Sequence, residues 1–346
     1  MQKSERWNLL EKCLNDRILI LDGAMGSLIQ EYKLKEEDYR GERWKDHHSS
    51  VKGNNDMLVI SKPNVIKEIH AKYLDVGVDL IETNTFSGTT VSMADYGMES
   101  DVYDLNFHGA KIAREVADEY TEKSPDKPRF VVGSMGPTTK IASMSPDVND
   151  PGYRDITFDE LAVAYQEQVG ALLDGGADIL LVETVTDTLN CKACLFAIQS
   201  EFDKRNCEWP VMVSGTITDA SGRTLSGQTA DAFLVSISHL PLLSVGFNCA
   251  LGARALKPHL QVLSENSAFA VSAHPNAGLP NEFGAYDETP EMMVDQITEY
   301  LDDGLVNILG GCCGTTPSHI QAVAIAASNY QPRVLPLRSV FSQGLK

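Results

Sequence analysis

The sequence has no long apolar run, and positive charge is scarce. No uninterrupted apolar stretch approaches the ~20 residues that a transmembrane helix needs. Lysine and arginine number 29 against 48 aspartate and glutamate residues, which gives a formal net charge of −19. Nucleic acids and anionic membranes bind basic surfaces, so this balance argues against both as partners. The first residues are charged and lack the apolar centre of a signal peptide, so we expect a cytoplasmic protein.

Cysteine is also sparse, with seven residues at irregular spacing. An odd number without regular spacing does not form a disulfide framework. In a reducing compartment such cysteines are free, metal-binding or catalytic. The apolar fraction of 43% is that of a globular protein with a substantial core.

Eight short apolar runs, rich in β-branched residues, alternate with amphipathic helical stretches. Near-continuous apolar runs are typical of parallel strands that are buried on both faces. Eight of them, separated by helices, favour a closed (β/α)₈ TIM barrel over an open sheet, here with an N-terminal helical extension. The expected strands are residues 18–21, 80–83, 130–133, 179–182, 211–214, 243–247, 269–273 and 306–309.

The connections give the expected organisation of the chain. Long connections follow three strands, at 27–60, 137–156 and 216–228. The post-strand loops of a barrel share one rim, where active sites lie. A capping box from Thr157 to Glu160 predicts the start of a helix that ends at Gly175. We assign residues 1–331 to the barrel and 332–346 to a linker toward a following module.

Three cysteines provide the strongest chemical signal. Cys312 and Cys313 lie in a glycine-rich turn after the eighth strand, and Cys249 follows the sixth. Neighbouring residues of a strand point to opposite faces, so two adjacent cysteines share a metal only where glycines break the strand. Three thiolates without a fourth cysteine describe a catalytic zinc site with an open position. The alternative is that all three are simply small or buried residues.

Two further groups of candidate metal or redox residues give weaker signals. Asn276 is a candidate fourth zinc ligand in the absence of substrate, whereas His274 reads better as a structural histidine. Cys191 and Cys194 have the spacing of a redox motif. They fall within an expected helix, on one face, so we interpret them as core residues.

Acidic residues follow the first, second and fourth strands, at Asp22, Glu82 and Glu183. Converging carboxylates are costly unless a cation joins them or one of them is protonated, and a ligand ammonium would serve as the cation. For Glu82, capping of the next helix is an equally good interpretation. The backbone N–H groups around Gly23 could hold a carboxylate, so an amino-acid pocket is expected. Ser134 is a further candidate substrate-binding residue.

These residues resemble the homocysteine S-methyltransferase family over nearly the whole chain. Other segments are similar to the N-terminal homocysteine-binding modules of cobalamin-dependent methionine synthases. The resemblance implies a barrel whose three cysteines bind zinc, with Glu183 on the homocysteine amino group and Asp22 and Gly23 in the amino-acid-binding turn. The similar segments are residues 41–44, 52–56, 82–86, 145–149 and 215–228.

The resemblance has one gap, because the sequence has no Asp-x-His-x-x-Gly motif for cobalamin and nothing like a folate barrel. We therefore expect a methyltransferase module that activates homocysteine as a zinc thiolate and forms methionine with methylcobalamin, which is bound by a cobalamin-binding module of the same polypeptide. Alternatives are a transferase with a small-molecule donor, a docking barrel with structural zinc, and an amino-acid-binding scaffold that has lost activity.

Overall fold

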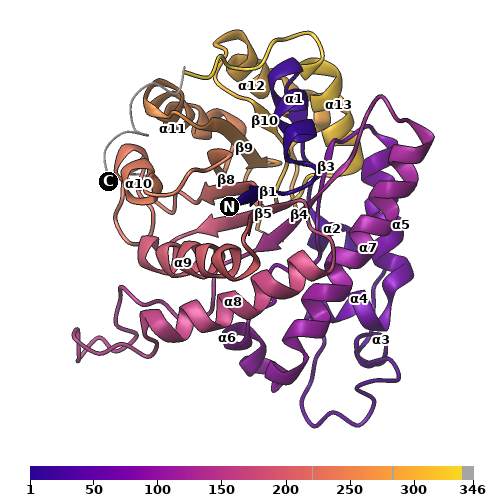
Figure 1. Cartoon of the computed structure of the whole chain (residues 1–346), viewed down its shortest axis with the longest axis vertical. Helices are drawn as coiled ribbons and strands as arrows, with labels where there is room; N and C mark the ends of the chain where they lie inside the picture. The colour runs from indigo at the N-terminus through magenta and orange to yellow at the C-terminus, as the bar shows by residue number, and fades with distance from the viewer. Residues whose placement is uncertain (220, 283, 337–346) are drawn as a thin grey trace.

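A computed structural model describes residues 1–219, 221–282 and 284–336 of the chain. Eight parallel strands follow one another in the order β2-β10-β9-β8-β7-β5-β4-β3. A parallel bridge between Leu21 and Leu80 joins the two ends of this sheet, so the strands close into a ring. This confirms the predicted TIM barrel (Figure 1). The strands are β2 (Leu19–Ile20), β3 (Leu80–Glu82), β4 (Phe130–Met135), β5 (Ile179–Val185), β7 (Val211–Gly215), β8 (Ser244–Gly252), β9 (Ala270–Asn276) and β10 (Ile308–Leu309).

Helices surround the ring because each strand is followed by an amphipathic stretch that covers it. The predicted capping box is present at α8, where Thr157 accepts from the Glu160 backbone and Glu160 from that of Thr157. The helix ends at Gly175 as expected. The outer helices are α5 (Pro63–Asp75), α7 (Val102–Lys123), α8 (Phe158–Asp174), α9 (Thr188–Arg205), α10 (Ala230–Ile237), α11 (Ala253–Asn266), α12 (Pro290–Asp302) and α13 (Pro317–Ala327).

The barrel interior is a packed apolar core. Strand side chains such as Leu19, Phe130 and Met212 meet there and are fully buried. The N-terminal helix α1 (Trp7–Asp16) adds Leu10 and Leu14 to the same cluster. The expected N-terminal extension therefore closes one end of the barrel. It is joined there by a short two-stranded sheet of β1 (Gln2–Lys3) and β6 (Cys207–Glu208).

The three long connections differ from one another. The first contains helical segments because its Tyr39, Trp44 and Leu58 are buried against the barrel. The second, between β4 and α8, projects at the lower left of Figure 1. The third has neither helix nor strand in its described residues. The helical segments near the first and after β3 are α2 (Met25–Glu31), α3 (Glu36–Arg40), η1 (Asn55–Met57), α4 (Leu58–Ser61), α6 (Thr90–Met93), η2 (Ala94–Tyr96) and η3 (Glu99–Asp101).

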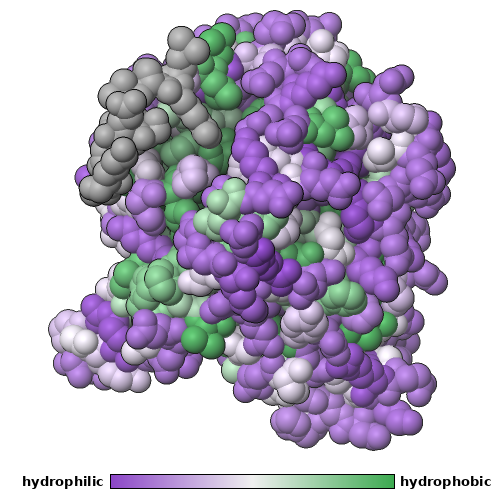
Figure 2. Space-filling view, viewed as in Figure 1, coloured by the Kyte–Doolittle hydropathy of each residue, from purple (hydrophilic) through white to green (hydrophobic). Residues whose placement is uncertain are grey.

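The surface is mainly polar, and hydrophilic residues cover most of the face in Figure 2. Among the described residues no helix is both long and apolar enough to span a membrane. Within the expected linker, Arg333 is buried and donates to the backbone oxygens of Ser264 and Ser267. The domain boundary at 331 stays a prediction, and residues 337–346 lie outside the described part of the chain.

Candidate metal and substrate site

The structure brings the three predicted cysteines together on the rim formed by the strand ends. Their sulfur atoms all lie within 4.8 Å of one another, and the Sγ atoms of Cys249 and Cys313 are 3.7 Å apart. Around one tetrahedral zinc ion, with Zn–S bonds of about 2.3 Å, two sulfurs lie roughly 3.8 Å apart. The sulfur spacing therefore fits a single shared ion.

Local breaks in two strands turn these thiols inward. At Cys249 and Ala250 φ is +58° and +54°, and the pairing of β8 with β9 shifts register between Asn248 and Gly252. Non-glycine residues seldom adopt such angles, and they concentrate at functional sites. The other pair lies in a turn that is held to β9, because the Cys312 N–H donates to the Pro275 oxygen at 2.9 Å. The glycine-flanked break was predicted, whereas the one at Cys249 was not.

The electrostatics of the cysteines favour a bound cation. Hydrogen bonds from Cys249 and Cys312 lower the pKa of Cys313 to about 3. The same contacts, together with burial, raise the pKa of Cys312 well above its ordinary value. Because close negative charges repel, all three thiols ionise together only beside a positive ion. Asn276 is buried and its Oδ1 has no hydrogen-bond partner, and the N–H of the next residue, Ala277, donates to the Cys313 oxygen at 3.0 Å.

Asn248 is a part of the site that the sequence interpretation missed. Its side-chain oxygen accepts from the Thr184 backbone at 3.0 Å and from the Ser214 hydroxyl at 2.7 Å. Its amide nitrogen donates to the Thr184 hydroxyl at 2.8 Å and contacts the Cys312 sulfur at 3.7 Å. One side chain thus ties three strand ends to a thiol. Its position next to Cys249 was the only signal in the sequence.

The predicted carboxylates also converge. Glu183 lines the cavity and accepts from the hydroxyl of Ser134, whose side chain is buried. Asp22 is buried, and its Oδ2 accepts from the backbone N–H of Glu82 at 3.0 Å. Burial raises the pKa of Glu183 to about 7, despite the opposing hydrogen bonds from Ser134 and Thr184. Burial also raises the pKa of Asp22, and the charge of Glu183 adds to this effect.

Gly23 follows Asp22 and lines the same cavity. A Cβ atom at this position would lie 2.5 Å from the Thr315 hydroxyl oxygen, so no larger residue fits. That hydroxyl accepts from the Ala24 N–H at 3.1 Å and donates to the Cys312 oxygen at 2.7 Å. The turn after β2 and the cysteine turn after β10 are therefore built against each other, which joins the predicted amino-acid turn to the predicted metal site.

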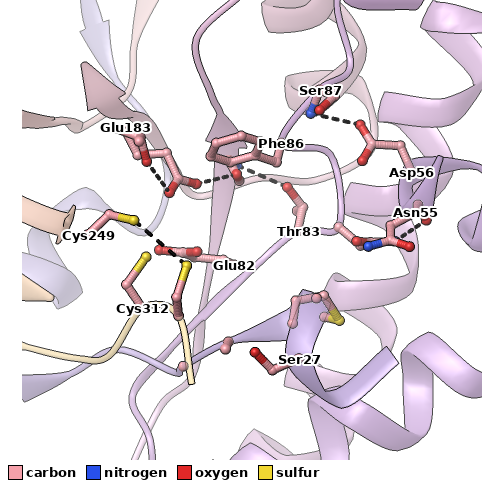
Figure 3. Close-up of a pocket in the computed structure, with 18 of the residues that line it drawn as sticks. Ser27, Asn55, Asp56, Glu82, Thr83, Phe86, Ser87, Glu183, Cys249 and Cys312 are labelled. Atoms are coloured by element: carbon pink, nitrogen blue, oxygen red, sulfur yellow. Dashed lines mark hydrogen bonds between the residues drawn. The ribbon is translucent and has the colours of Figure 1, made fainter. Parts of the chain in front are cut away.

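A cavity of about 330 Å³ connects these groups. Figure 3 shows Glu82, Glu183, Cys249 and Cys312 directed toward one end, with Asp56 and other polar residues at the other. Asp56 accepts from the Ser87 N–H at 2.9 Å, and burial raises its pKa to about 7. The remaining lining includes Gly23, Met25, Ser27, Asn54, Asn55, Thr83, Asn84, Phe86, Ser134, Asn248, His274 and Cys313.

The weaker candidates are a pair of cysteines in a helix and a histidine at the end of a strand. Cys191 and Cys194 are buried in α9, and burial raises the pKa of both thiols, as suits core residues. His274 lines the cavity, is 3% exposed and has an Nε2 atom without a partner. Its ring therefore lies at the site, and its interpretation as a structural histidine stays a prediction.

Comparison with known proteins decides the family. A sequence model of homocysteine S-methyltransferases matches residues 19–327. The chain belongs to the homocysteine S-methyltransferase family. Homocysteine methyltransferase MmuM from Escherichia coli has the same fold. Its metallated form is 21% identical at a TM-score of 0.70, covering 93% of this chain and 99% of that one. The apo form gives 21% identity and a TM-score of 0.67, covering 93% and 100%.

Family membership agrees with the site geometry in this methyltransferase. The match spans every strand of the barrel and all three clustered cysteines. Homocysteine methylation is therefore the activity of the family to which the chain belongs.

Proposed function

We propose that this homocysteine S-methyltransferase binds homocysteine as a zinc thiolate and forms methionine with a methyl group from methylcobalamin. The observation that carries the proposal is the spacing of Cys249, Cys312 and Cys313, which fits one tetrahedral ion beside a cavity lined by carboxylates. A reducing compartment such as the cytoplasm would keep the three thiols free.

The three cysteines would hold the zinc ion, and Asn276 would complete its coordination until substrate arrives. The unpartnered Asn276 oxygen supports this assignment, because a neutral amide is a weak ligand that a thiolate displaces. Bound zinc would lower the pKa of the substrate thiol and so supply a nucleophile at neutral pH. A thiol with an ordinary pKa of ~8.5 is otherwise mostly protonated there.

The amino-acid part of homocysteine would lie between the strand ends. Glu183 would accept from the substrate ammonium, and Ser134 orients Glu183 through their hydrogen bond. Asp22 would add a second carboxylate, while the turn at Gly23 would receive the substrate carboxylate. Homocysteine would thus be held both at its sulfur and at its amino-acid group. This would fix the position of the sulfur and lower the entropic cost of methyl transfer.

The donor assignment rests on the segments that are similar to methionine synthases. Two of them, 52–56 and 82–86, line the cavity, and Asn55 and Asp56 lie at its end away from the cysteines. The sequence has no cobalamin motif, so the corrinoid would come from a cobalamin-binding module of the same polypeptide. A family member that uses a small methylated donor is the alternative, and the two differ in which donor supports turnover.

The experiment compares the full chain with Cys312→Ala, and with Cys207→Ala as a control in β6 away from the site. We expect zinc binding and methyl transfer from methylcobalamin in the parent and control, and loss of both in Cys312→Ala. Zinc-edge X-ray absorption should show one additional sulfur ligand after homocysteine is added. Near-normal turnover of Cys312→Ala would refute the ligand assignment, and turnover only with a small methylated donor would refute methylcobalamin.

A further inference from the structure

Glu82 contributes a third carboxylate to the amino-acid end of the cavity. It is the last residue of β3, and its side chain lines the cavity together with Glu183. Its backbone N–H donates to Asp22, so these two acidic residues are directly linked, and Glu183 shares the cavity wall with Glu82. Figure 3 shows Glu82 directed toward the same space as Glu183 and the cysteine sulfurs.

The structure contradicts the interpretation of Glu82 as a helix cap. The next helix, α6, is capped by Thr89, whose hydroxyl accepts from the Ser92 N–H at 3.2 Å. Among the described residues, no hydrogen bond reaches the Glu82 carboxylate. A glutamate that faced the cavity for structural reasons would be expected to have a partner there.

The acceptors left open in this group match the donors of one primary ammonium. Asp22 Oδ1 is buried without a partner. On Glu183, Oε1 accepts from Ser134, whereas Oε2 receives only a long 3.4 Å contact from the Thr184 hydroxyl. With the free carboxylate of Glu82, each of the three residues has an available oxygen. An –NH₃⁺ group has three N–H donors.

The charge balance also favours a cation from outside the protein. No lysine or arginine is present among the described residues that line the cavity. Burial raises the pKa of Glu82, and the charges of Glu183 and Asp22 raise it further. The raised pKa values mean that the empty cluster takes up protons, whereas a bound ammonium would stabilise its ionised form.

We propose that Glu82 is a specificity-determining residue that supplies the third acceptor for the substrate ammonium, so that the cavity selects thiols with an unmethylated α-amino group. This inference rests on the proposed function. With three acceptors, the cavity would distinguish a free ammonium from a methylated one, which a single carboxylate does not do. Replacing one N–H by a methyl group would leave a buried carboxylate without its partner.

The test measures binding of thiols to the zinc-loaded full chain by titration calorimetry. The ligands are homocysteine, 4-sulfanylbutanoate, which lacks the amino group, and N,N-dimethylhomocysteine. The variants are Glu82→Gln and, as a matched control on the outer face of α8, Glu167→Gln. In Glu82→Gln we expect homocysteine to bind about 10-fold or more weakly, which is typical of losing a hydrogen bond to a charged group. Binding of 4-sulfanylbutanoate should change less than about 2-fold, because that ligand makes no such bond.

Several outcomes would overturn the inference. Equal weakening of both thiols would show a general structural effect of Glu82, and unchanged homocysteine binding would remove its role. If Glu82→Gln fails to fold, binding to the unsubstituted protein still tests the inference. There, N,N-dimethylhomocysteine binding as tightly as homocysteine would contradict a site with three acceptors. Failure of the proposed function is distinguishable, since neither thiol would then add a sulfur to the zinc of the parent.

Discussion

Asp56 is a buried carboxylate at the end of the cavity away from the cysteines. Burial raises its pKa from an ordinary 3.8 to about 7, although the Ser87 N–H opposes the shift. The folded protein therefore holds this proton more tightly than the unfolded chain does. Stability from Asp56 is complete below about pH 4 and is lost as the pH rises to about 7.

Asp56→Asn should remove this dependence, because an amide does not titrate and still accepts from Ser87. Relative to the parent, the metal-free and reduced variant should gain unfolding free energy as the pH rises from 4 to 7. Urea unfolding, followed by circular dichroism at intervals of pH, measures this difference. If the unfolding free energies of the two proteins change in parallel across this pH range, the raised pKa of Asp56 is contradicted.

At the residue scale, the sequence predicted which chemically reactive side chains come together better than it predicted the residues that hold them in place. Cys249, Cys312 and Asp22 were recognisable because each follows an apolar run and carries chemistry suited to a rim. Asn248 was not, because its role depends on Thr184, Ser214 and Cys312 arriving at one point from different strands. Asparagine after a strand is common, and only the register of neighbouring strands shows what it bonds.

At the element scale, the end of β8 is the least regular part of the barrel that bears on the site. Ala250 has a φ of +54°, a conformation that costs an alanine roughly 1 kcal/mol or more and costs glycine little. This local strain turns the preceding Cys249 toward the other sulfurs. The strain is therefore a cost of placing the Cys249 sulfur in the cluster.

Ala250→Gly should accordingly raise the unfolding free energy, by up to about 1 kcal/mol after the greater freedom of the unfolded chain is counted. Ala322→Gly in the middle of α13 is the matched control and should lower it by about 1 kcal/mol. Urea unfolding of both variants measures these changes. Equal destabilisation by the two substitutions would show that residue 250 is not strained.

The same element shows why strand existence was predictable and strand length was not. The run at 243–247 is apolar because both faces of the strand are buried, so it was visible in the sequence. The structure continues β8 to Gly252, where it pairs with Asn276 beyond a register shift. Such pairing involves polar residues in an irregular backbone and leaves no periodic pattern. The helices within 27–60 were not predicted for a similar reason, because each is too short to show a clear helical periodicity of apolar residues.

At the scale of the whole molecule, the candidate site and the packing of the N-terminal helix lie at opposite ends of the barrel. The cysteines, carboxylates and cavity all lie at the ends where the strands finish. At the opposite end, α1 buries Leu10 and Leu14 among the residues that fill the barrel interior. In barrels of this kind, residues at the N-terminal face serve stability and those at the C-terminal face serve chemistry.

This separation makes a prediction about α1. Leu14→Ala should lower the unfolding free energy by about 2–5 kcal/mol, because the side chain is 4% exposed and its removal leaves a cavity in the interior. Leu9→Ala, on the exposed side of the same helix at 40% exposure, should change it by less than about 0.5 kcal/mol. Both variants should keep full zinc content and homocysteine affinity at low temperature, where each remains folded. Loss of homocysteine affinity in folded Leu14→Ala would show instead that the two ends of the barrel are coupled, because nothing in α1 reaches the cavity.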